Sequence, residues 1–133
     1  LRMKQHCANA EKVVSFLETQ KKVTNVIYPT NHQGEIKERA KKYMQGGYGS
    51  LVGMDVGTKE NGAKFIDNLK MLYHVANIGD ARSLAIHPAT TTHSQLNDKE
   101  LLAAGVTPGY VRLSIGIEHP DDIIADIKQA LAA

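Results

Sequence analysis

This chain of 133 residues has a single cysteine, no long apolar run and no marked excess of one charge. The one cysteine, Cys7, excludes an intrachain disulfide and is compatible with a reducing compartment, so we expect a cytoplasmic protein. No apolar run approaches the roughly 18 residues of a membrane span, and the opening residues lack the apolar core of a secretory leader. The 16 basic residues nearly balance the 14 acidic ones without a long run of either sign, so neither nucleic acid nor a membrane is an expected partner.

The length fits a single domain over residues 1–133, and no internal repeat, low-complexity tract or linker divides it. A helix over residues 1–20 is predicted from apolar residues at helical spacing: Met3, Cys7, Ala10, Val14 and Leu17. No capping residue precedes this pattern. We therefore expect the helix to continue from protein upstream of Leu1.

Helices and strands alternate along the rest of the chain. Four strands are predicted from short apolar runs: residues 23–29, 49–56, 83–88 and 110–116. Four further helices are predicted from helical spacing and capping signals: residues 36–44, 58–69, 97–105 and 120–131. The apolar stripe of the first of these four is Ile36, Ala40, Tyr43 and Met44. The pattern predicts an α+β fold, a small and mostly antiparallel sheet with helices packed on one face.

Several motifs that suggest chemistry have simpler interpretations. His87 and His93 match no usual metal-ligand spacing and have no acidic or cysteine partner nearby, so hydrogen-bonding roles are favoured and no metal is expected. Cys7 lies on an apolar stripe, which favours packing over nucleophilic chemistry. The glycines of residues 46–49 end a helix and enter a strand, whereas a phosphate-binding loop leaves a strand and opens a helix.

Arg112 is the unusual residue of the last strand, "YVRLSIG". Strand alternation sends Val111, Leu113 and Ile115 to one face and Arg112 to the other. A solvated arginine on the wet face of an antiparallel sheet is the commoner case. The alternative is functional, because a planar fork of donors on a rigid strand suits a two-point grip on a carboxylate.

Two long motifs carry a family resemblance. The stretches "NIGDARSLAIHPATTTHSQL" (77–96) and "GVTPGYVRLSIGIEHPDDIIADI" (105–127) resemble the C-terminal region of the Cys/Met-metabolism family of pyridoxal-phosphate (PLP) enzymes. Within that family they are most similar to the O-acetylhomoserine sulfhydrylase branch, since Asn77 stands where γ-synthases and γ-lyases usually carry serine. The opening "LRMKQHCANA" resembles the long helix that follows the cofactor domain of these enzymes.

The resemblance implies that residues 1–133 are a C-terminal substrate-clamping domain, the small domain of a fold-type I PLP enzyme. Arg112 matches the arginine that binds the substrate α-carboxylate. Asn77 matches a position that meets the same carboxylate, and Thr92 matches a threonine that supports the arginine. Ser83 and His87 also lie in the matched motifs and are given structural roles.

The PLP lysine of the family lies in an N-terminal large domain, so no catalytic or cofactor-binding residue is expected in this chain. Lys59 and Lys64 receive no catalytic role, and the isolated chain is expected to bind no PLP and to be inactive. For the complete protein, the resemblance implies a homotetramer that makes homocysteine or methionine from O-acetylhomoserine and sulfide or a small thiol by γ-replacement. The alternatives are a cystathionine γ-synthase or methionine γ-lyase type, a stand-alone amino-acid-binding regulatory module, and an inactive structural fragment.

Overall fold

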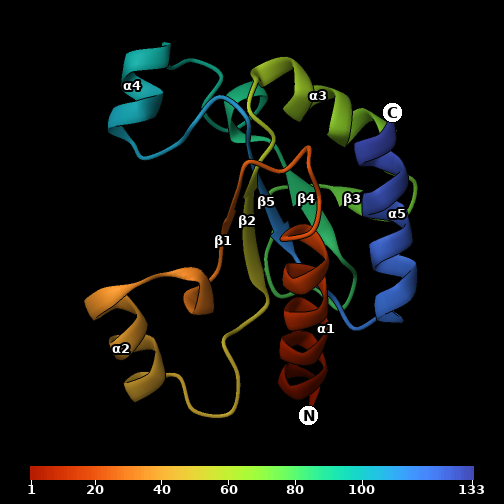
Figure 1. The fold of residues 1–133 in the computed structure, drawn as a ribbon. Coiled ribbons are helices and arrows are strands. Elements are labelled where there is room, and N and C mark those ends of the chain that lie inside the picture. Colours follow the sequence, from red (N-terminus) through yellow and green to blue (C-terminus); the bar gives the residue numbers. More distant parts are fainter.

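One five-stranded sheet organises the chain, and the computed structural model describes all residues from Leu1 to Ala133 (Figure 1). The strands are β1 (Asn25–Ile27), β2 (Leu51–Asp55), β3 (Tyr73–His74), β4 (Leu84–Ile86) and β5 (Tyr110–Ser114). Their order is β1-β2-β5-β4-β3, and every neighbouring pair is antiparallel except β3 with β4. The predicted mostly antiparallel sheet is therefore confirmed, with β5 at its centre.

Five helices accompany the sheet: α1 (Arg2–Leu17), α2 (Gly34–Tyr43), α3 (Lys59–Asn68), α4 (Asp98–Ala103) and α5 (Pro120–Ala132). Short 3-10 turns cover Pro29–Asn31 and Pro88–Thr90. The apolar sides of α1, α3 and α5 pack on one sheet face in a single core, which includes Val52, Met54, Val111, Leu113 and Ile115 from the strands. No helix is both long and apolar enough to cross a membrane.

Helix α2 departs from the predicted packing, because it lies beside the β1 edge and away from the core helices (Figure 1). Of its predicted apolar stripe only Ala40 is buried, whereas Ile36 is 55% and Tyr43 is 71% exposed. Spacing alone identified the helix correctly but did not show whether its apolar side faces this chain's core. The same limit applies to Met3 of α1, which belongs to the helical spacing of that helix but is 57% exposed.

Two buried polar residues hold α1 to the end of β5. The ring Nδ1 of His6 donates a hydrogen bond of 2.6 Å to the carbonyl of Ile115. The amide of Asn9 donates to the carbonyls of Gly116 and Glu118 at 3.0 and 2.8 Å. These bonds satisfy backbone acceptors that follow the last strand, and they fix α1 across the sheet.

The predicted helix starts agree with the structure. Thr58 caps α3 by accepting a hydrogen bond from the Asn61 N–H at 3.1 Å. Asn97 and Glu100 form a reciprocal capping box at the start of α4, and Pro120 is the first residue of α5. Strand β3 was not predicted, because its two exposed residues carry no alternating pattern.

Candidate functional site

Arg112 lies in β5 on the sheet face opposite the core. Its neighbours Val111 and Leu113 are fully buried against the helices, while Arg112 itself is half-buried. In register, Arg112 pairs with Gly53 of β2 and Ile86 of β4. The strand on either side keeps the backbone at Arg112 rigid, and the predicted direction of its side chain is confirmed. We call this side of the sheet the Arg112 face.

The Arg112 face is less polar than strand alternation suggested. Leu84 and Ile86 of β4 share this face with Arg112 and Ser114, and both are almost completely buried. The Arg112 guanidinium therefore lies beside the apolar side chains of Leu84 and Ile86. Low local polarity strengthens any contact that Arg112 makes with an anion.

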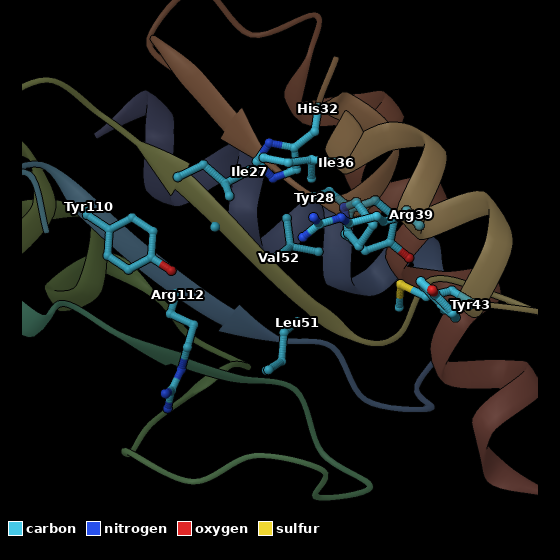
Figure 2. Close-up of a pocket in the computed structure, with 14 residues that line it drawn as sticks. Ile27, Tyr28, His32, Ile36, Arg39, Tyr43, Leu51, Val52, Tyr110 and Arg112 are labelled. Carbon is cyan, nitrogen blue, oxygen red and sulfur yellow. The ribbon is translucent and has the colours of Figure 1, made fainter. Parts of the chain in front are cut away.

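A groove of about 510 Å³ opens between this face and α2 (Figure 2). Tyr110 and Arg112, two residues apart on β5, both line this groove, and in Figure 2 the Arg112 guanidinium points away from the side chains of α2. Gly53 makes space for the tyrosine, because a Cβ there would come within 2.8 Å of the Tyr110 ring. The remaining lining residues are Ile27, Tyr28, Pro29, His32, Ile36, Arg39, Ala40, Tyr43, Met44, Leu51 and Val52. The groove thus combines apolar walls with two arginines.

The structure brings Asn77 to Arg112. The Nη2 of Arg112 donates a long hydrogen bond of 3.5 Å to the backbone carbonyl of Asn77. The side chain of Asn77 accepts from the N–H of the next residue, Ile78, at 2.9 Å and so stays within its own turn. The side chain of Arg112 forms no salt bridge and no other hydrogen bond. Its other donors are available to a ligand, and a carboxylate offers the matching pair of acceptors.

Thr92 is not joined to this pair. Its hydroxyl lies 2.8 Å from Nδ1 of His93, it is exposed, and it makes no hydrogen bond with Arg112. The role of Thr92 as a support for Arg112 therefore stays a prediction.

Ser83 and His87 are both completely buried and hydrogen-bonded. The ring of His87 contacts the Thr90 hydroxyl at 2.9 Å and the Pro108 carbonyl at 2.7 Å. Burial lowers the pKa of His87 below its usual value, partly offset by the bond to Pro108. A neutral histidine that bridges two loops suits the structural role predicted for it. No group of three or more His, Cys, Asp or Glu side chains is placed to hold a metal ion.

The groove does not present a site for covalent binding of PLP. Its lining contains no lysine, the residue type that holds PLP as a Schiff base. Lys59 and Lys64 are exposed on α3, which packs with the core helices on the opposite face. The residues of this groove fit a carboxylate beside Arg112 and supply no Schiff-base lysine.

The sequence patterns did not indicate that α2 and Tyr110 border the same groove as Arg112. The signal for Tyr110 was available, since residues two apart in a strand share a face. No comparable signal existed for Arg39 or His32, because the side on which α2 packs is set by tertiary structure.

Comparisons with known proteins agree with this geometry. A family model described as Cys/Met metabolism PLP-dependent enzyme matches residues 1–132. The O-acetyl-L-homoserine sulfhydrylase of Leptospira meyeri is 50% identical over 98% of this chain and 30% of its own length. An L-methionine gamma-lyase of Fusobacterium nucleatum subsp. polymorphum is 42% identical over 98% of this chain and 33% of its own length.

A solved structure is also similar. The crystal structure of a Campylobacter jejuni protein assigned as an O-acetylhomoserine (thiol)-lyase contains N'-pyridoxyl-lysine-5'-monophosphate. It superposes on this chain with a TM-score of 0.90 and 41% identity, covering 99% of this chain and 32% of that one. Fold and site together define a small α+β domain of a PLP enzyme. The chain belongs to the Cys/Met metabolism PLP-dependent enzyme family, as its two long motifs predicted, and it spans about 30% of the length of the curated relatives.

Proposed function

We propose that this chain is the C-terminal, substrate-clamping domain of an enzyme that makes homocysteine or methionine from O-acetylhomoserine and sulfide or a small thiol. The observation that carries this proposal is the Arg112 guanidinium, which stands on the central strand and bonds in the chain only to the Asn77 carbonyl. The 50% identity to an O-acetyl-L-homoserine sulfhydrylase supports this reaction over others of the family.

Arg112 would bind and orient the substrate without moving protons, because a guanidinium stays protonated at every relevant pH. A carboxylate held at two points on a rigid strand fixes the rest of the amino acid relative to the cofactor. PLP, supplied by an N-terminal domain, provides the electron-accepting ring for bond changes in the substrate. No residue of this chain is assigned to the chemical steps, and we propose that the domain alone is inactive.

Replacing Arg112 by lysine in the full-length protein tests the proposal. The variant Arg112→Lys keeps the charge but loses the planar fork. Loss of one charge-assisted hydrogen bond is worth about 1.5–3 kcal/mol, so we expect kcat/KM for O-acetylhomoserine to fall at least about tenfold. The fall should appear mainly in KM, and the visible absorbance of bound PLP should not change.

Arg39→Lys is the matched control, because Arg39 lies in the same groove but is exposed and paired with Glu35 at 2.6 Å. It should leave both kinetic constants within about twofold, as expected for a weak surface ion pair. A methyl ester of O-acetylhomoserine should be affected little by Arg112→Lys. Unchanged KM in Arg112→Lys, or loss of bound PLP, would contradict the carboxylate-binding role.

A second candidate is elimination at the γ-carbon, which the 42% identity to an L-methionine gamma-lyase favours. The two candidates use the same arginine and differ in the fate of the substrate. Release of methanethiol from methionine would indicate the lyase, whereas sulfide-dependent formation of homocysteine from O-acetylhomoserine would indicate the transferase.

A further inference from the structure

The loop that carries Asn77, residues 75–83, is fastened to the segment that follows β5, residues 115–118. The N–H of Ile117 donates to the Ala81 carbonyl at 2.8 Å. A Cβ at Gly116 would collide with the Ala81 carbonyl and the Glu118 carboxylate, so the two backbones approach closely there. The segment is therefore a fixed support against which the loop packs.

Glu118 makes the strongest connection within this unit. Its Oε1 accepts from the Ser83 N–H at 2.6 Å, and its Oε2 accepts from the Ser83 hydroxyl at 2.9 Å. The same hydroxyl accepts from the Gly116 N–H at 2.8 Å and is completely buried. Glu118 has no salt-bridge partner, so both of its charge-assisted bonds go to the end of the Asn77 loop.

The segment is held from its other side by α1. Asn9 donates to the carbonyls of Gly116 and Glu118, which prevents the segment from following the loop if the loop shifts. A continuous set of short bonds thus runs from α1 through Glu118 to the loop. At the far end of this loop, Asn77 meets Arg112 at 3.5 Å, the outer limit of a hydrogen bond.

We propose that Glu118 is a positioning residue for carboxylate binding, which acts by fixing the Asn77 carbonyl relative to the Arg112 guanidinium. This inference rests on the proposed function of Arg112. Because the contact at 3.5 Å is so long, a small loop shift changes which donors of Arg112 face the Asn77 carbonyl and which face the substrate. Glu118 lies outside the groove and does not touch the substrate.

The test uses the full-length protein with Glu118→Ala. We expect KM for O-acetylhomoserine to rise about tenfold, the scale of a lost charge-assisted hydrogen bond, with kcat within about twofold. The methyl ester should show no such rise. In an Arg112→Lys background the Glu118→Ala effect should shrink, because the two residues act through one clamp. Asp122→Asn, an exposed carboxylate four residues away, is the control and should change neither constant.

The results for the two variants distinguish the positioning role of Glu118 from the carboxylate-binding role of Arg112. If Arg112→Lys raises KM and Glu118→Ala does not, the positioning role is wrong and the carboxylate clamp stands. If neither variant raises KM, the proposed function fails and the positioning role fails with it. An equal loss for the acid and the ester would show a general structural role and overturn the inference. Should Glu118→Ala not fold, Glu118→Gln, which keeps one acceptor oxygen, is judged by the same criteria with a smaller expected rise.

Discussion

Asp126 is a buried charge that is satisfied by backbone donors. It lies on the core side of α5 and is 6% exposed. Its carboxylate accepts from the consecutive N–H groups of Lys70, Met71 and Leu72, each at 2.9 Å, and from the Gln129 amide. Burial acts to raise the pKa of Asp126, but these hydrogen bonds outweigh it and hold the pKa below its usual value.

Asp126→Asn should lower the free energy of unfolding by about 2–3 kcal/mol at pH 7, because the new amide turns donors toward backbone N–H groups. The Asp126 carboxyl has a lower pKa in the folded protein than in the unfolded chain, where it is about 4. The ionised carboxylate therefore stabilises the folded protein fully above about pH 4, and this stabilisation is lost as the pH falls through the folded pKa. Urea unfolding of both proteins should therefore show a difference that shrinks below about pH 4. A difference that grew on acidification would contradict the assigned pKa direction.

Arg112 could be placed on the correct face from sequence, because alternation in a strand is local. His6, Asn9 and Asp126 could not be identified as buried polar residues, because their partners lie 54 to 109 residues away in the chain. On a helical wheel, a polar residue on the apolar side looks only like a break in the apolar stripe. Only the tertiary structure shows the backbone groups that it satisfies.

Helix α4 depends on its cap more than the longer helices do. It spans six residues and buries only Leu101, so little packing stabilises it. The side chain of Asn97 accepts from the N–H groups of Lys99 and Glu100 at 3.0 and 3.1 Å. A short helix of this kind is marginal without such bonds.

Asn97→Ala should destabilise α4 by about 1 kcal/mol, as the loss of an N-cap usually does. Amide hydrogen exchange in residues 99–103 should become about fivefold faster, while exchange in β5 should not change. Gln95→Ala is a suitable control, since Gln95 is exposed in the loop before the helix. Equal acceleration in both variants would show that the capping box contributes nothing.

At the scale of elements, the capped helices and the strands of the central sheet were predictable because their signals are local. The position of α2 was not predictable. Its apolar and charged residues indicate an amphipathic helix, but they do not indicate which surface its apolar side packs against. The same residues in a complete enzyme would face whatever adjoins the Arg112 face.

The whole molecule exposes an apolar surface around the groove, and we expect the isolated chain to associate through it. Ile27, Ile36, Tyr43 and Leu51 are 38, 55, 71 and 42% exposed along this surface. Contiguous apolar patches larger than a few hundred Å² commonly mark association surfaces. Sedimentation velocity should show dimers or larger species that increase with concentration.

Substituting lysine for both Ile36 and Tyr43 should shift the isolated chain toward the monomer. The matched control is Leu102→Lys on α4, a residue that is 59% exposed but lies outside the groove. A wild-type chain that stays monomeric at high concentration would count against a large uncovered interface.

The bonds from His6 and Asn9 to carbonyls of residues 115–118 have a consequence for biosynthesis. They join positions 107 to 109 residues apart, so α1 emerges from the ribosome long before its partners exist. Closing so long a loop is entropically costly, and contacts of this range form late in folding. Throughout translation of the middle of the domain, the apolar side of α1 is without its sheet, and the nascent chain is most open to proteases and chaperones in that interval.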